Sequence, residues 1–250
     1  MKRFLIALQF LTVLPINIKS QIAEEDFGGS LLYFPVVGLL IGFVPAGMVL
    51  LLDFLPSPVV GMLILIISIV MTGGIHLDGF ADTCDGFYGK WPKEKILEIM
   101  RDSRIGTMGA VGVVCLLLLK FTLIVSIPEN VLWKQLIMMT VFARWSQVLA
   151  CCTSDYAREE GKGKYFVSHA GKASLFAGSV FTVIVFLLLM RFKGIVLLVP
   201  SFAGVLLFIN YAKKKIGGMT GDTIGATSEI AEITVLFFGL VYSELHTAWF

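Results

Sequence analysis

Long runs of apolar residues, separated by short charged segments, constrain this chain more than any other feature. A helix needs roughly twenty apolar residues to cross a bilayer. With 57% hydrophobic and 15% charged residues and a mean hydropathy of +0.87, the chain is too apolar for an ordinary soluble domain. We therefore predict an all-α polytopic membrane bundle that forms one domain over residues 1–250. The predicted spans cover about 31–52, 59–75, 106–127, 131–152, 173–190, 194–211 and a short last run that ends near 242.

The first eighteen residues precede these spans and need a separate interpretation. Met1, Lys2 and Arg3 are followed by an apolar stretch that Pro15 interrupts, which superficially resembles a secretory signal. No convincing small-residue cleavage site follows, and the next span begins soon afterwards. We expect a retained interfacial or re-entrant segment.

The distribution of charge predicts the orientation of the bundle. Most of the 20 Lys and Arg residues fall in segments that share one side of a seven-span arrangement. By the positive-inside tendency this side is cytoplasmic, which predicts that the N-terminus lies inside. The polar segments 76–104, 153–172 and 213–230 all lie on that side, so they can converge on one active site facing the cytoplasm.

Composition also limits the partners of the chain. The net charge is only +2 and no basic tail is present, so we expect no nucleic acid partner and a lipid bilayer as the surroundings. The sequence leaves open whether the chain forms a homo-oligomer.

An acidic segment follows the second predicted span directly. Asp78, Asp82 and Asp85 are spaced by four and three residues, which places them on one face of a helix. Three neighbouring carboxylates repel one another unless cations neutralise them, and Mg²⁺ prefers such oxygen ligands. A solvated polar face that caps a membrane helix would also explain the pattern. The accompanying His76 and several glycines, which allow a ligand to approach the backbone, favour a site.

Two further segments carry matching chemistry. Arg101 and Arg104 stand beside the glycine-containing start of the third span, where guanidinium groups and free N–H groups suit phosphate, although a basic collar at the bilayer surface is the alternative. Asp102 favours a phosphate site, because a basic collar at the bilayer surface would not require an acidic residue. The second segment, 217–232, contains glycines, hydroxyls and three acids, namely Asp222, Glu229 and Glu232. A loop with Thr220 or Thr223 as a helix cap explains its hydroxyls but not its glutamates.

Arg144 lies within a span, where an unpaired charge is costly. We therefore expect it to have a partner, either an acid of another span or a substrate phosphate. Lys120 can extend towards the interface and carries less weight. The middle polar segment, with Tyr156, Arg158 and Lys164, is interpreted mainly as a surface loop, with contact to substrate as the alternative.

Four motifs occur in an order that resembles the cobalamin synthase family, the adenosylcobinamide-GDP ribazoletransferases. They are His76–Gly86, Asp102–Thr107, Ala143–Trp145 and Gly218–Asp222. The segment Gln9–Pro15 is also similar to the family's opening, with Val13 where a basic residue is expected, and Cys84 replaces a smaller residue. Neither departure removes a carboxylate. The similarity extends over essentially the whole chain.

The resemblance implies an integral inner-membrane enzyme that uses Mg²⁺. It implies transfer of the adenosylcobinamide phosphate group from adenosylcobinamide-GDP to alpha-ribazole or its 5′-phosphate, with release of GMP. On this basis we predict that Asp82, His76 and Arg104 are catalytic, with His76 as base unless a metal-bound hydroxyl needs none. The predicted substrate contacts are Arg101, Arg104, Arg144, Thr107 and Thr220. The predicted metal ligands are Asp78, Asp82 and Asp85, completed by Asp102, Asp222 or Glu229.

Two other classes use related features. A phosphotransferase of the CDP-alcohol type also uses spaced aspartates at the membrane surface, but its Asp-Gly-x-x-Ala-Arg run is missing, since Phe80, Ala81 and Asp82 follow Gly79. A membrane cation transporter would place acids through the depth of the membrane, typically with repeat symmetry. In this chain the acids cluster on one side and no internal repeat is visible.

Overall fold

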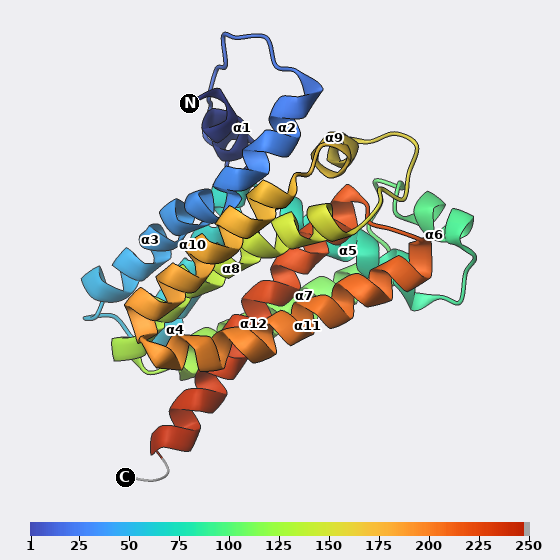
Figure 1. Ribbon diagram of the computed structural model, residues 1–250. Helices are drawn as coiled ribbons and strands as arrows, with labels where there is room; N and C mark the ends of the chain where they lie inside the picture. The colour runs from blue at the N-terminus through green and yellow to red at the C-terminus, as the bar shows by residue number, and fades with distance from the viewer. Residues whose placement is uncertain (248–250) are drawn as a thin grey trace.

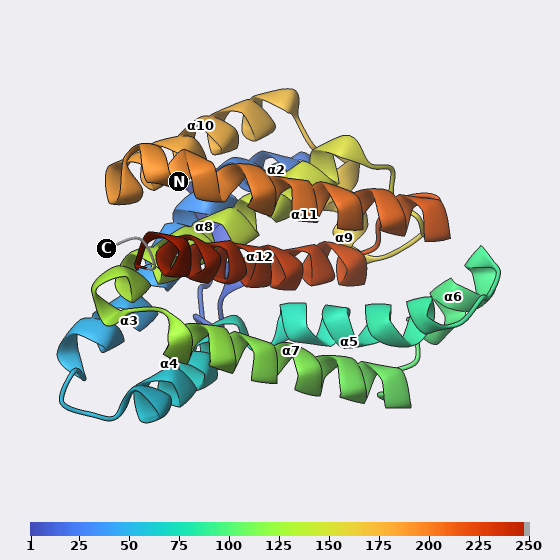
Figure 2. The same ribbon diagram turned by 90° about the horizontal axis from the view of Figure 1, so that it is seen from below.

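The structure is a computed structural model that describes residues 1–247, and it is built from helices (Figures 1 and 2). The long helices run roughly side by side, whereas α1, α2, α6 and α9 gather at the end of the bundle away from the C-terminus. The bounds are α1 Lys2–Leu11, α2 Glu24–Ser30, the 3-10 turn η1 Leu31–Tyr33, α3 Phe34–Leu51, α4 Ser57–Thr72, α5 Ile75–Tyr88, α6 Lys93–Ile99, α7 Thr107–Ser126, α8 Glu129–Thr153, α9 Lys162–Ser168, α10 Lys172–Met190, α11 Phe192–Ile216 and α12 Gly221–Thr247.

The helices agree with the predicted polytopic bundle. Within the described residues, six helical stretches are long and apolar enough to cross a membrane, or seven if α4 and α5 together form one broken span. Helix α8 lies at the centre, because 89% of its most apolar window is buried within the protein. It packs against α3, α10 and α12. Its central position explains why polar side chains on α8 must find partners inside the bundle.

The boundary between α4 and α5 differs from the prediction. Gly73 and Gly74 have φ angles of 63° and 68°, a left-handed conformation that costs glycine little. The chain bends there by 91°. Residues 76–104 were predicted as a polar segment, but their first half forms α5, which packs against α7 and α12. Asp78, Asp82 and Asp85 therefore lie on a helix that belongs to the bundle, with Asp78 exposed.

The start of the last span also differs from the prediction. Helix α11 continues to Ile216 and α12 begins at Gly221, so the expected polar segment 213–230 shrinks to a short turn. Hydropathy underestimated α12 because its acidic side chains face other helices rather than lipid. As a result, Asp222 and Glu229 belong to one continuous helix.

The N-terminal segment agrees with the prediction of an interfacial or re-entrant element. Helix α1 has ten residues, too few to cross a bilayer, and packs against α2 and α3. The chain then returns to the bundle, where the Val13 N–H donates a hydrogen bond of 2.9 Å to the Met71 carbonyl oxygen at the end of α4.

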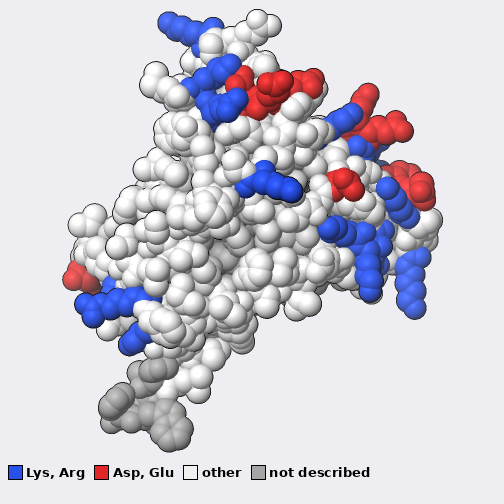
Figure 3. Space-filling model, in the orientation of Figure 1, with Lys and Arg blue, Asp and Glu red and all other residues white. Residues whose placement is uncertain are grey.

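Charged side chains are concentrated at the two ends of the bundle. In the view of Figure 3 they gather at the end that carries α1, α2, α6 and α9, with a smaller group near the opposite end. Between these ends the visible surface is almost free of charge, as expected for a belt of protein that faces lipid tails.

One glycine brings α5 and α12 into close contact. A Cβ atom at Gly79 would lie 2.7 Å from the Asp222 carbonyl oxygen and 2.8 Å from its Cα. Both are backbone atoms, which cannot move aside as a flexible side chain can. Gly79 therefore allows the two acidic segments to meet.

This contact predicts the effect of adding one methyl group. Gly79→Ala should lower the midpoint of unfolding in a detergent titration, because overpacking of this kind typically costs about 1–3 kcal/mol. Gly47→Ala in α3 is the matched control, since a Cβ there meets nothing within 4 Å. The control should be neutral or slightly stabilising, because alanine favours helix over glycine by about 1 kcal/mol. Equal midpoints for the two variants would contradict the assigned contact.

Candidate active site

A cavity of about 270 Å³ lies where α1, α5, α8, α9 and α12 meet. Its lining combines acidic, basic and aromatic side chains from segments that are far apart in the sequence. The lining residues that matter for its chemistry are Phe10, Phe34, His76, Asp78, Gln147, Tyr156, Arg158, Phe166 and Asp222. Several polar groups thus converge on one partly enclosed space, which is the usual form of a ligand site.

Backbone pairing places the middle polar segment beside the start of α12. The Met219 N–H donates to the Asp155 carbonyl oxygen at 2.9 Å, and the Ala157 N–H donates to the Met219 carbonyl oxygen at 2.8 Å. Arg158 follows directly and places its Nη2 atom 2.8 Å from Oδ2 of Asp222. The segment expected to be mainly a surface loop therefore supplies a cation to the cavity.

Sequence reasoning gave too little weight to Arg158 and missed Gln147 and the three phenylalanines. Only the location of Arg158 in a polar segment on the predicted cytoplasmic side pointed to it. Burial of the Tyr156 side chain beside it raises the pKa of the phenol, so Tyr156 stays neutral.

Three carboxylates approach one another at the α5–α12 contact. Asp82 interacts electrostatically with both Asp222 and Asp78, and Arg158 is the cation that opposes this repulsion. Among the side chains that the structure describes, no three acidic, histidine or cysteine residues already enclose a metal position. Two carboxylates with substrate oxygens would suit Mg²⁺, which commonly binds in this way. The donor atoms therefore fit a hard divalent cation that arrives with a phosphate ligand.

His76 is buried at the inner side of the cavity, where its ring contacts α8. Its Nδ1 lies 3.1 Å from Nε2 of Gln147, and an amide NH₂ group can only donate. The two side chains are therefore hydrogen-bonded, and His76 Nε2 has no partner among the described residues. Close packing continues on α12, where a Cβ at Gly225 would lie 3.3 Å from the His76 Cα.

Asp85 also acts electrostatically on Asp82, but its carboxylate caps α7. Its two carboxylate oxygens each accept a hydrogen bond of 2.7 Å, one from the Gly106 N–H and one from the Gly109 N–H. A Cβ at either glycine would lie within 2.4 Å of this carboxylate. The N–H groups that the sequence offered to phosphate are thus already used by Asp85.

The turn before α7 is exposed. Arg104 and Asp102 form an ion pair there, with Arg104 Nη2 2.7 Å from Asp102 Oδ2. Hydrogen bonds from Arg104 lower the pKa of Asp102 to about 2. Thr107 is exposed at the first position of α7. Arg101 is exposed too, but it interacts electrostatically with Tyr156 of the cavity lining.

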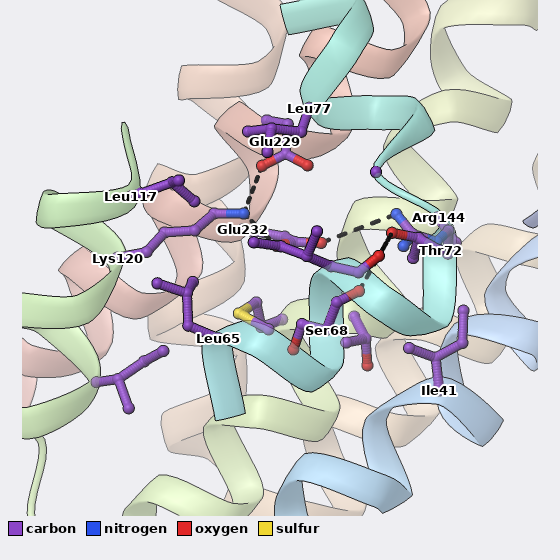
Figure 4. Close-up of a pocket in the computed structure, with 15 residues that line it drawn as sticks. Ile41, Leu65, Ser68, Thr72, Leu77, Leu117, Lys120, Arg144, Glu229 and Glu232 are labelled. Carbon is purple, nitrogen blue, oxygen red and sulfur yellow. Dashed lines mark hydrogen bonds and ion pairs between the residues drawn. The ribbon is translucent and has the colours of Figure 1, made fainter. Parts of the chain in front are cut away.

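A buried ionic network lies deeper in the bundle (Figure 4). Lys120 of α7 donates hydrogen bonds to Glu229 and Glu232 of α12. Arg144 of α8 donates to Ser228 and lies 3.8 Å from Glu232, measured from Nη1 to Oε1. Two cations and two carboxylates balance in charge. Of the two partners considered for Arg144, the structure provides the acid of another span, and Glu229 is engaged by Lys120.

Thr220 is buried just before α12 and stabilises its start. Its backbone N–H donates to Thr223 Oγ1 at 2.8 Å, and the Thr223 N–H donates to Thr220 Oγ1 at 3.2 Å. This arrangement is the helix cap that the sequence offered as one explanation of both threonines. It also sets the position of the neighbouring Asp222.

The fold and this cavity together define a class of protein. A polytopic membrane bundle that gathers carboxylates and arginine at one end of its helices is suited to chemistry on a phosphate-bearing substrate. Comparison with known proteins identifies the family. The family model described as cobalamin-5-phosphate synthase matches residues 3–240, and the chain belongs to this family.

Named relatives agree with this assignment. The adenosylcobinamide-GDP ribazoletransferase of Acetivibrio thermocellus is 40% identical and that of Geotalea daltonii is 39% identical. These alignments cover 95% and 94% of this chain, and 98% and 96% of the relatives. The protein of the same name from Clostridium acetobutylicum is 36% identical over 98% of this chain and 97% of its own length. No solved structure matches the chain.

The buried network predicts a large effect from loss of its lysine. Lys120→Met leaves Glu229 and Glu232 without their main cation, and breaking a buried pair in this way typically costs about 3–5 kcal/mol. We expect loss of the folded protein after detergent extraction, measured by gel filtration and unfolding. Lys19→Met, at an exposed position, should behave as wild type. Adding Glu229→Gln to Lys120→Met should recover part of the loss, and a double variant no better than the single one would contradict the network.

The cap on α7 predicts that Asp85 tolerates an amide but not a methyl group. Asp85→Ala removes both acceptors and should destabilise the protein by about 1–2 kcal/mol, the usual cost of a lost cap. Asp85→Asn retains one acceptor and should keep most of the stability and the activity. Both are measured by unfolding midpoint and turnover. Loss of activity in a stable Asp85→Asn protein would instead support the metal-binding role predicted from the sequence.

Proposed function

We propose that this chain transfers the adenosylcobinamide phosphate group of adenosylcobinamide-GDP to alpha-ribazole or its 5′-phosphate, with release of GMP. The names and near-complete coverage of the relatives support this proposal. The structural observation that carries it is that Asp78, Asp222 and Arg158 line one cavity, with Asp82 near enough to interact electrostatically with all three. A phosphate-bearing substrate needs both cationic contacts and a place for divalent cations.

The reaction exchanges a phosphoanhydride bond for a phosphoester bond. A ribose hydroxyl oxygen of the acceptor bonds to the phosphorus next to the cobinamide, the bond from that phosphorus to the GMP oxygen breaks, and the hydroxyl proton leaves to solvent or a nearby carboxylate. Negative charge grows on the phosphoryl oxygens and on the departing GMP. We expect Arg158, which pairs with Asp222 at the cavity, and Arg101, which interacts electrostatically with Tyr156 of the lining, to bind these oxygens.

Mg²⁺ is the cofactor that this donor set suits best. Asp78, Asp82 and Asp222 would hold it, and when bound it would neutralise charge on the diphosphate. Arg158 already pairs with Asp222, so a phosphate group can share Arg158 while the carboxylates face the cation. The chain's own residues thereby orient the diphosphate relative to the acceptor.

The distribution of basic residues supports a cellular location for the protein. We place the protein in the bacterial inner membrane with the cavity facing the cytoplasm. The basic side chains near α6 and α9 support this orientation, because basic residues are enriched in cytoplasmic segments. A nucleotide substrate and Mg²⁺ are both available on that side.

A turnover assay tests the function and the acidic cluster together. Purified protein in detergent should release GMP from adenosylcobinamide-GDP when alpha-ribazole and Mg²⁺ are present, and EDTA should stop the release. Asp82→Ala should lower kcat by roughly 10²–10³-fold, the usual range for removal of one charge-stabilising group. Asp53→Ala, at an exposed position between α3 and α4, is the control and should keep full activity. A stable Asp82→Ala protein with normal turnover would refute the role of this residue.

A further inference from the structure

The cavity has a second part that phosphate chemistry does not explain. Phe10 of α1, Phe34 at the start of α3 and Phe166 of α9 all contribute to its lining. Ring centroids lie 4.6 Å apart for Phe10 and Phe166, and 5.7 Å apart for Phe34 and Phe166. Three helices from different parts of the chain therefore place aromatic rings together at this wall. Such a wall suits a flat apolar or aromatic group.

Two buried polar atoms belong to the same cavity and lack a hydrogen-bond partner among the described residues. They are Nε2 of His76 and Oε1 of Gln147. His76 is 4% exposed and Gln147 is 1% exposed, so neither atom is served by bulk solvent. His76 Nδ1 and the Gln147 amide pair with each other, which leaves the second ring nitrogen of His76 and the second polar atom of the amide without partners.

A hydroxyl group can pair with either atom, because it both donates and accepts hydrogen bonds. Buried polar atoms without partners are costly, so two of them on residues that line one cavity point to a bound polar group. The cavity of about 270 Å³ is small for a ligand site, so it suits a nucleoside better than a corrin macrocycle.

We propose that this part of the cavity is the subsite for the nucleoside acceptor, a two-ring aromatic base joined to ribose. The base packs against Phe10, Phe34 and Phe166, and one ribose hydroxyl lies between His76 and Gln147. The inference rests on the function proposed above. His76 acts here as a binding residue, held in place by its hydrogen bond to Gln147. The corrinoid stays outside the cavity, towards the exposed Asp78.

Variants on one helix test the aromatic wall. Phe10→Leu should raise the KM for alpha-ribazole roughly tenfold, as expected for loss of one base-stacking ring. The KM for adenosylcobinamide-GDP and the kcat should stay within about twofold of wild type, because the phosphate contacts are unchanged. Phe4→Leu is the matched control, since Phe4 lies on the same helix but packs against Tyr33, at 5.8 Å between ring centroids. It should leave both KM values unchanged.

Acceptor analogues test the hydroxyl contact on the unaltered protein. Of two alpha-ribazole analogues, one without the 2′-hydroxyl and one without the 3′-hydroxyl, one should bind roughly tenfold more weakly to wild type. Gln147→Met removes the acceptor and should itself raise the KM for alpha-ribazole. In that variant the difference in binding between this analogue and alpha-ribazole should shrink, because one of the two partners of the hydroxyl is gone.

The outcomes separate this inference from the function on which it rests. Absence of GMP release by wild type with these substrates would refute the proposed function. Normal release together with unchanged binding of both analogues would overturn the subsite while the function stands. An increase in the KM for adenosylcobinamide-GDP in Phe10→Leu would likewise overturn it, because the aromatic wall would then contact the other substrate.

Discussion

The backbone contact between α5 and α12 is the constraint on which the rest of the site depends. Gly79 permits it, because any larger residue would overlap the backbone of Asp222. This contact joins two acidic segments separated by more than half of the chain. It also lets Arg158 share the space next to Asp222, so positive and negative groups meet at the same cavity. The proposed site therefore depends on close packing of α5 against α12 at Gly79.

Electrostatic balance then determines how deep polar residues can lie. Lys120 and Arg144 are buried with Glu229 and Glu232, so the four charges cancel inside the helices. Charges left unpaired there would be too costly to keep. The same network links α7, α8 and α12, the last two of which also line the cavity. A structural role for these residues leaves the less buried acids near α5 available for substrate.

Much of the architecture could be predicted from the sequence, because hydropathy reports directly on contact with lipid. The helical positions of Asp78, Asp82 and Asp85 followed from spacing alone, and α5 confirms them. Spacing could not say what each carboxylate contacts, however. Asp85 turned to the glycines at the start of α7, because those glycines leave room for it. The assignment of metal and substrate contacts remains a prediction for most of the proposed residues.

The sequence by itself determined the membrane class, the approximate spans, the shared side of the polar segments and the family resemblance. These properties depend on composition and local order, which are visible in one dimension. Only the tertiary structure decided that Gly73 and Gly74 turn α5 back into the bundle. It alone decided that Gln147 orients His76 and that Phe10 and Phe166 share a wall. Such contacts join residues distant in sequence, and their energy depends on distance and burial, which the order of residues does not specify.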